Sequence, residues 1–250
     1  VIRSDAFDAD FTGEFAFSTL IPSLTAFINN YMASLKMTHD TVEYHISGQE
    51  LNYWVQFKKT NDIEAIFLPF LKIAPETYLK GTYNEEKKVL SMIGHSPLLN
   101  ISGIELEGWY VDAETTTDNL SLKTGCAQLI MDRTTKQDSI YVQLDSLLLS
   151  TNIHRDSILY DLSSKMTKDY SFLRGFLTSR EDGSVKIKVD EMDLLIAGQN
   201  WHISEDNFVI LDTSYLEIND ITLQSTAQCI AVNGKLTKNQ IDTIDLQFNK

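Results

Sequence analysis

The sequence predicts a mainly β protein: an elongated, curved antiparallel sheet, shaped like a taco or a groove, with one amphipathic helix near the N-terminus. Three observations predict it. Apolar and polar residues alternate over short stretches along most of the chain, as in strands that bury one face. Asp182-Gly183 and Asn233-Gly234 are dipeptides typical of tight hairpin turns, which make neighbouring strands antiparallel. A short pattern in which the alternation slips recurs along the chain.

The recurrent pattern is an apolar residue, two mostly polar residues, and then apolar residues in alternation. Residues two apart share a face of a strand, so apolar residues three apart indicate a switch of phase, at a β-bulge or at a corner between two strands. Repeated switches predict a long sheet that keeps curving around an apolar concave face. The copies are residues 106–111, 144–149, 189–194, 218–223 and 241–246.

One segment near the N-terminus, residues 24–36, has helical rather than strand periodicity. Pro22 and Ser23 precede it and suit a helix start. We expect this helix to fill one end of the sheet core; the alternative is that it plugs or gates an apolar groove. Its apolar stripe is Leu24, Phe27, Ile28, Tyr31, Met32 and Leu35.

The rest of the chain reads as strands at short intervals. With 4 prolines and no Ser/Gly-rich stretch, no linker is evident, and we expect a single β domain over residues 1–250. The expected strands are 42–46, 52–57, 78–83, 140–144, 158–162, 171–178, 185–189 and 208–211.

Composition excludes several classes of function. The formal net charge of −14 argues against nucleic acid, which needs clustered Lys and Arg, and it also disfavours anionic membrane surfaces. No apolar run approaches the ~20 residues of a membrane helix. The chain begins at Val1 without Met, so we expect a segment of a longer protein. Cys126 and Cys229 lack metal-ligand spacing; we expect buried free thiols, and a bridge between them stays open.

The sequence contains no motif for catalysis or cofactor binding, so we expect neither an enzyme nor a metal site. His39 and His45 lie close together but lack further ligands. Residues 8–13 resemble the start of a calcium loop, yet Thr19 stands at its twelfth position, where a bidentate Glu is needed.

Aromatic residues allow two interpretations. Exposed on a sheet, they would stack on sugars; inside a curved sheet, they would fill the core, which we favour because Tyr53 fits the apolar alternation. The residues concerned are Tyr53, Trp54, Trp109, Tyr110 and Trp201.

Several segments resemble TamB proteins of the AsmA-like superfamily. They are residues 70–81 (FLKIAPETYLKG), 200–204 (NWHIS), 207–210 (NFVI), 218–223 (INDITL) and 228–236 (QCIAVNGKL). The resemblance covers roughly residues 65–250, and more loosely residues 11–13 and the helix.

The resemblance implies a cell-envelope protein of Gram-negative bacteria, anchored in the inner membrane by a segment absent here. Its periplasmic body of repeated strands forms a groove with an apolar interior. That groove is thought to carry phospholipid toward the outer membrane, in connection with outer-membrane protein assembly by an Omp85-type barrel. The family has no catalytic residues to map. We therefore expect a periplasmic interior segment of such a protein.

The expected function is non-enzymatic holding or transfer of lipid; the alternative is a structural or adhesive β-module that binds glycan. An apolar wall suffices for lipid, because each CH₂ removed from water contributes about 0.8 kcal/mol. For every candidate below, ordinary core packing stays an open alternative. The groove candidates are Val142, Leu144, Ile187, Val189, Leu194, Ile196, Ile218, Ile221, Leu223, Ile230, Val232, Leu246 and Phe248.

Overall fold

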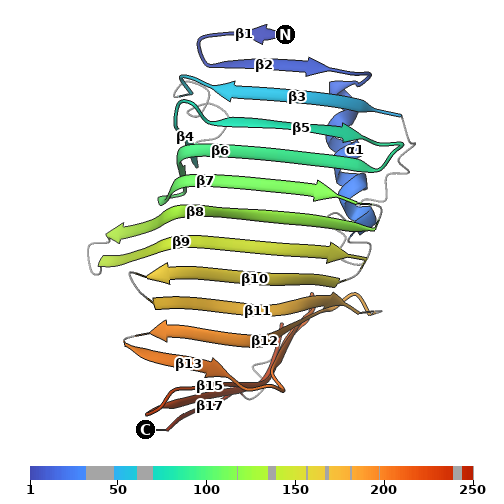
Figure 1. Cartoon of the computed structure of the whole chain (residues 1–250). Helices are drawn as coiled ribbons and strands as arrows, with labels where there is room; N and C mark the ends of the chain where they lie inside the picture. Colours follow the sequence, from blue (N-terminus) through green and yellow to red (C-terminus); the bar gives the residue numbers. More distant parts are fainter. Residues whose placement is uncertain are drawn as a thin grey trace. The chain divides into compact units, whose positions relative to one another are not determined.

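A computed structural model of the chain confirms the mainly β fold, with antiparallel strands and one helix among the described residues (Figure 1). The structure describes residues 1–31, 48–60, 70–116, 118–134, 139–155, 157–166, 169–180, 182–196, 198–238 and 244–249. The expected strand 42–46, together with His39 and His45, lies outside them. The chain divides into two compact units, residues 1–28 with 40–150 and residues 29–39 with 151–250. The expectation of a single domain stays a prediction.

The first unit is an antiparallel sheet in the order β1-β2-β3-β5-β6-β7-β8, with β4 pairing to the far end of β6. The strands are β1 (Ile2–Arg3), β2 (Phe7–Thr12), β3 (Glu50–Phe57), β4 (Leu71–Ile73), β5 (Tyr78–Asn84), β6 (Val89–Ile101), β7 (Ile104–Thr115), β8 (Asn119–Thr134) and the first part of β9 (Ser139–His154).

The second unit is also antiparallel. Strands β10, β11 and β12 pair in sequence; β12 then pairs with both β14 and β13, which both pair with β15, and β16 and β17 follow. The strands are β10 (Ser157–Met166), β11 (Asp169–Ser179), β12 (Val185–Ile196), β13 (Gln199–Ile203), β14 (Phe208–Leu211), β15 (Tyr215–Gln224), β16 (Cys229–Thr237) and β17 (Ile244–Asn249).

The helix, α1 (Phe17–Tyr31), begins before Pro22, so the expected start at residue 24 was wrong. The carbonyl of Ala16 accepts from the N–H groups of Thr19 and Leu20 and opens the helix earlier. Gln49 holds this end, because its Oε1 accepts from the Ala16 N–H at 3.2 Å. Pro22 therefore lies inside the helix, although it cannot donate a backbone hydrogen bond. Residues 32–36 of the expected helix lie outside the described part.

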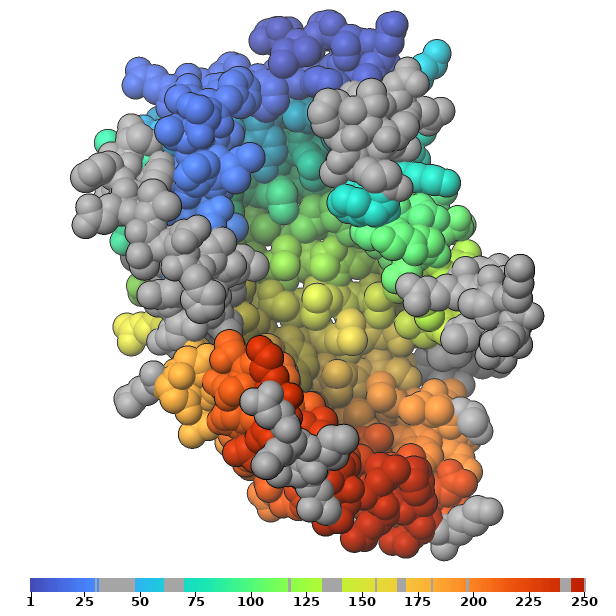
Figure 2. Space-filling model, turned by 180° about the vertical axis from the view of Figure 1, so that it is seen from behind, coloured from blue at the N-terminus to red at the C-terminus, as the bar shows by residue number. Residues whose placement is uncertain are grey.

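Helix α1 packs on the sheet of the first unit through Tyr83 on β5. The Phe27 ring meets the Tyr83 ring edge-on, with centroids 5.4 Å apart, and the Ser23 and Tyr83 hydroxyls form a hydrogen bond. All three residues are buried. Figure 2 shows the blue helix in front of the blue-green strands on this face. The helix thus fills part of the core of the first unit.

The expected switches of strand phase are confirmed where the structure describes them. The third residue of three copies has a positive φ: Gly108 (61°), Ser146 (51°) and Asp220 (49°). In the copy at residues 189–194, Arg174 pairs with Glu191 while Gly175 pairs with Val189, so Asp190 is one extra residue. Most of the switch in the copy at 241–246 lies outside the described residues.

The positions at which the phase switches lie opposite each other on neighbouring strands. In the first unit, Pro97 on β6 falls opposite Gly108 on β7, and β4 and β5 pair with β6 on either side of Pro97. In the second unit, β13 and β14 pair with β12 on either side of Asp190. Each unit therefore has one line of irregular positions across several neighbouring strands, which we call its crease. Aligned bulges bend a sheet at such a line.

The two expected hairpin dipeptides have different outcomes. Asp182-Gly183 connects β11 to β12, where the Gly183 N–H donates to the Arg180 carbonyl, so that prediction is confirmed. Asn233-Gly234 lies inside β16, so the turn expected there was wrong. The reason is the crease: Asn233 hydrogen-bonds Asp220 at the bulge of β15, and Gly234 has a φ of 146° beside it.

Candidate functional site

Strands β14 to β17 present one face made entirely of apolar residues and glycine. Residues directly opposite each other in a sheet share a face, and the register pairs Val209 with Ile218, Ile221 with Val232, and Val232 with Leu246. We call this the apolar face. Its members on these strands are Val209, Leu211, Leu216, Ile218, Ile221, Leu223, Ile230, Val232, Gly234, Leu236, Ile244, Leu246 and Phe248.

The apolar face continues onto β12 and its neighbours because the bulge at Asp190 restores the phase. Val189 pairs with Gly175 and Met192 with Leu173, and these two β11 residues lie two apart and share a face. Without the extra residue, the side chains that follow the bulge would point to the other side. The β12 members are Val185, Ile187, Val189, Met192, Leu194 and Ile196, and Leu194 faces Trp201 on β13.

The register brings eleven of the thirteen groove candidates onto this one face of the second unit. Val142 and Leu144 belong to the first unit, where they are half-buried on β9 and flank the exposed Gln143. The eleven are Ile187, Val189, Leu194, Ile196, Ile218, Ile221, Leu223, Ile230, Val232, Leu246 and Phe248.

Exposure varies along the apolar face. Leu211 is 43% exposed, Leu246 53% and Phe248 68%. By contrast Met192 and Trp201 are buried near the crease. All strands of this unit belong to one hydrogen-bonded sheet. A wide apolar surface that a sheet leaves accessible is typical of a binding site.

The opposite face of the same sheet, the polar face, carries the charged side chains, and cations cover three of its aromatic rings. Arg174 lies over Phe172, with its guanidinium carbon 4.7 Å from the ring centroid. Lys186 covers Phe208 at 4.4 Å. Lys235 covers Tyr215 at 4.1 Å. Such contacts keep the cation hydrated while they shield the ring.

Ion pairs are further features of the polar face. Arg174 bridges two strands, since its Nε lies 2.8 Å from Asp161 on β10 and its Nη1 3.2 Å from Glu191 on β12. These carboxylates raise the pKa of the Arg174 guanidinium, first of all through the Asp161 hydrogen bond. The ion pairs of this unit therefore lie on the polar face, which also contains the buried Ile210.

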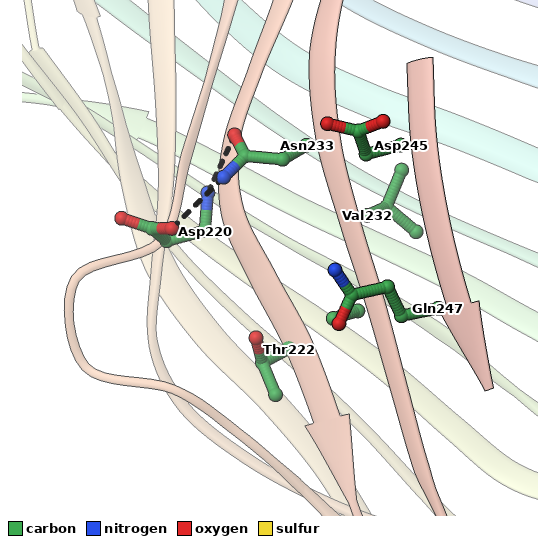
Figure 3. A pocket seen from close by; sticks show the side chains of 7 residues that line it. Asp220, Thr222, Val232, Asn233, Asp245 and Gln247 are labelled. Carbon is green, nitrogen blue, oxygen red and sulfur yellow. Dashed lines mark hydrogen bonds between the residues drawn. The ribbon is translucent and has the colours of Figure 1, made fainter. Parts of the chain in front are cut away.

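A pocket of about 250 Å³ opens beside the crease, among residues of β15, β16 and β17 (Figure 3). Asn233 Nδ2 donates to Asp220 Oδ1 at 3.0 Å across it. Asp245 is the second carboxylate in its wall. No three His, Cys, Asp or Glu side chains converge as metal ligands anywhere in the described residues. The pocket is lined by Asp220, Thr222, Ala231, Val232, Asn233, Asp245 and Gln247.

The aromatic candidates divide between the units. Trp201 is 7% exposed and its indole Nε1 is buried without a hydrogen-bond partner. It therefore offers no ring face to a sugar and packs into the apolar face. Trp109, half-buried, stands opposite Ser96 on β6. In the first unit, burial raises the pKa of the Tyr53 phenol to about 12.

Both cysteines are free thiols. Cys126 is buried on β8, and burial raises the pKa of its thiol despite a hydrogen bond to the Leu147 backbone. Cys229 is half-buried on β16. The expectation of free thiols is confirmed, although only Cys126 is fully buried.

Sequence reasoning missed several members of the apolar face, among them Met192, Trp201, Val209 and Leu216. The signal was present, because each lies two residues from another apolar residue of the same strand. The sequence analysis also did not identify Asn207, which lies between β13 and β14 at the crease and whose side chain hydrogen-bonds the backbone of β12. Asn207 Nδ2 donates to the Val189 carbonyl at 2.7 Å, and its Oδ1 accepts from the Val189 N–H at 3.0 Å. No pattern of alternation marks a residue of that kind.

Neither membrane-spanning helices nor known relatives indicate the function of this chain. Among the described residues, no helix is long and apolar enough to cross a membrane. No protein-family model, no curated protein and no solved structure matches the chain.

Proposed function

We propose that this chain holds the acyl chains of lipid against its apolar face and acts without catalysis, as a lipid-holding or lipid-transfer segment. The observation that carries the proposal is the uniform apolar character of one face over β14 to β17, with Leu211, Leu246 and Phe248 exposed on it. Water contact with such a surface is costly, and a hydrocarbon ligand removes it.

The dimensions of the face suit an acyl chain. Neighbouring strands lie about 4.8 Å apart, so the step from β14 to β17 spans roughly 14 Å. One leaflet of a bilayer is about 15 Å deep in its hydrocarbon region. A chain lying across these strands would contact apolar side chains along most of its length, at about 0.8 kcal/mol per CH₂ fully removed from water.

The chemistry of the face favours hydrocarbon over a polar ligand. Its members on β14 to β17 carry no side-chain donor or acceptor, whereas the polar face of the same strands carries carboxylates, amides and Lys235. A headgroup would therefore have to lie beyond the edge of the face. The ligand class we propose is defined by its acyl chain and not by its headgroup.

The resemblance to TamB proteins supports the wider setting of the proposal. We propose phospholipid as the ligand and the periplasm as the location, within a longer envelope protein that works between the inner and outer membranes. An Omp85-type barrel is the proposed partner of that longer protein. The net charge of −14 suits contact with acyl chains better than adsorption to anionic headgroups.

The test is lipid extraction from the gently purified protein, together with titration of a fluorescent acyl probe. We expect co-purified phospholipid and saturable probe binding. Leu211→Gln removes part of the apolar face and should weaken probe binding about tenfold, the equivalent of about 1.4 kcal/mol and within the value of one leucine side chain.

The matched control is Leu159→Gln on β10, since Leu159 pairs with Phe176 on the opposite face and is 58% exposed. Probe affinity should be unchanged in this variant. No extractable lipid and no probe uptake would overturn the proposal. Equal loss in both variants would show that the probe does not bind the apolar face.

A further inference from the structure

The indole of Trp201 carries an unpaired hydrogen-bond donor on the apolar face. Trp201 lies on β13 and is 7% exposed. Of the buried side-chain nitrogen atoms in the described part of the chain, its Nε1 is the one without a hydrogen-bond partner. An indole N–H can only donate, and a buried donor without an acceptor is destabilising. At this position, an acceptor atom on a ligand would therefore gain a hydrogen bond and relieve that cost.

The register places this donor beside a row of apolar side chains. Trp201 pairs with Leu194 of β12, and directly opposite residues share a face. Ile203 lies two residues from Trp201 and so points to the same side, and it pairs with Leu223 of β15. Leu223 pairs in turn with Ile230 of β16. An apolar row of Ile203, Leu223 and Ile230 therefore crosses the strands next to the indole.

Polar but uncharged side chains lie on the other side of the indole. Gln199, two residues before Trp201, points to the same side of the sheet. Its Oε1 accepts from the Ser225 hydroxyl at 2.8 Å, and both residues are half-buried. Trp201 thus stands at a border, where the apolar face gives way to neutral polar groups.

This chemistry suits a neutral acceptor better than an anion. Three cations of this unit lie on the polar face, where they cover aromatic rings: Arg174, Lys186 and Lys235. A carboxylate or phosphate beside Trp201 would have apolar neighbours and a neutral N–H as its partner, and an unpaired charge in such surroundings is costly. An ester carbonyl oxygen is an uncharged acceptor at the end of an acyl chain. It requires a donor and no counter-ion.

We propose that the Trp201 Nε1–H donates a hydrogen bond to the ester carbonyl oxygen of a bound acyl ester, whose hydrocarbon chain lies along Ile203, Leu223 and Ile230. The polar remainder of the ligand then faces Gln199. This inference rests on the proposed lipid-holding function. It adds a polar contact, an orientation of the ligand and a preference for esterified over plain hydrocarbon chains.

The burial of the indole nitrogen strengthens the contact. Because Trp201 Nε1 is covered in the structure, the carbonyl must displace apolar side chains to reach it. The hydrogen bond would then form away from water, where it is electrostatically stronger than at an exposed site. A ligand without an acceptor would leave the donor unpaired, so the site should distinguish the two classes of ligand.

The first test compares methyl laurate with the straight-chain alkane of equal length. Each is titrated against the fluorescent acyl probe bound to the full chain. Trp201→Phe removes the N–H and keeps an aromatic ring. It should weaken methyl laurate binding about tenfold more than alkane binding, the equivalent of roughly one hydrogen bond. The ratio between the two ligands cancels the change in packing that both experience.

The matched control is Trp109→Phe on β7, since Trp109 is half-buried and belongs to the first unit. It should leave both affinities unchanged, and circular dichroism checks that each variant is folded. Equal weakening of both ligands by Trp201→Phe would overturn this inference and leave the proposed function standing. If neither the probe nor the two ligands bind the original protein, the proposed function fails, and this inference fails with it.

Nuclear magnetic resonance of the unsubstituted protein gives an answer even if Trp201→Phe does not fold. The chain contains 3 tryptophans, so isotope-labelled indole nitrogens give one side-chain signal each. Trp54→Phe and Trp109→Phe assign two of the signals and leave the third to Trp201. Methyl laurate should move the Trp201 indole proton downfield, as a new hydrogen bond does, whereas the alkane should not. An unmoved proton at saturating methyl laurate, or the same shift with both ligands, would refute the contact.

Discussion

Replacing Gly175 by alanine should destabilise the second unit, although alanine is the better residue in a strand by propensity. Gly175 lies on β11, opposite Tyr160 on one side and Val189 on the other. A Cβ added there would lie 2.0 Å from the Lys188 carbonyl oxygen and 2.6 Å from the Tyr160 hydroxyl. That hydroxyl already donates to the same carbonyl at 2.9 Å, so a shift that makes room for the Cβ would disturb this hydrogen bond.

The magnitude follows from two opposing effects. Inserting a carbon into a filled space costs about 1–3 kcal/mol. Replacing glycine by alanine in a strand contributes about 0.5–1 kcal/mol in the favourable direction. The difference between these ranges is about 0–2.5 kcal/mol, and the contact with a backbone oxygen favours its upper half, so the free energy of unfolding should fall by about 1–2.5 kcal/mol, which urea denaturation followed by circular dichroism can resolve.

A second glycine provides the internal control, because Gly81 in the first unit has almost the same surroundings. A Cβ on Gly81 would lie 2.0 Å from the Ser91 carbonyl oxygen and 2.6 Å from the Tyr53 hydroxyl. If the two units unfold separately, Gly175→Ala and Gly81→Ala should shift different transitions. A Gly175→Ala variant as stable as the original protein would refute the packing argument.

Three further predictions concern single side chains. Asn207→Leu should lower the free energy of unfolding in urea by about 1–3 kcal/mol, because it removes the Asn207 partners of the half-buried Val189 N–H and C=O; a loss below about 0.5 kcal/mol would contradict this. Ser146 has a φ of 51°, so Ser146→Gly should leave the free energy of unfolding unchanged, whereas Ser146→Val should lower it by about 1–2 kcal/mol because β-branched residues avoid this conformation. Equal melting temperatures for the two variants would contradict this. The phenol pKa of Tyr53 is raised to about 12 against about 10 in the unfolded chain, so the unfolded state ionises first and stability should fall as pH rises from 10 to 12. Ultraviolet titration against Tyr53→Phe would detect this late phenolate, and ionisation near pH 10 in the folded protein would contradict the burial of the phenol.

Much of the candidate site follows from local periodicity. A strand alternates its faces with a period of two, and a bulge adds one residue that restores the phase. Apolar residues spaced by two, and by three across a slip, therefore stay on one side whatever the order of the strands. For this reason eleven candidates chosen from the sequence share the apolar face. The hairpin turn at Asp182-Gly183 likewise depends only on a few consecutive residues, and for this reason the sequence predicted it.

Other features depended on partners distant in sequence. Asn233-Gly234 has the composition of a turn, but hydrogen bonds from β15 and β17 hold it in a strand. The residue before α1, Ala16, donates its N–H to Gln49, which lies more than one helix length away along the chain. Strands β4 and β13 were not among the expected strands; β4 stops before β5 and β13 before β14 at the crease.

The sequence by itself determined which side chains of one strand share a face, because that depends on backbone geometry over a few residues; the register between strands then placed these faces on one side of the sheet. It determined the strand composition of the fold and the positions of the bulges for the same reason. Only the tertiary structure decided which members of that face are covered. Trp201 is buried at the crease while Phe248 is 68% exposed on β17, since exposure depends on which strands lie alongside, and the order of strands is set by contacts among all of them.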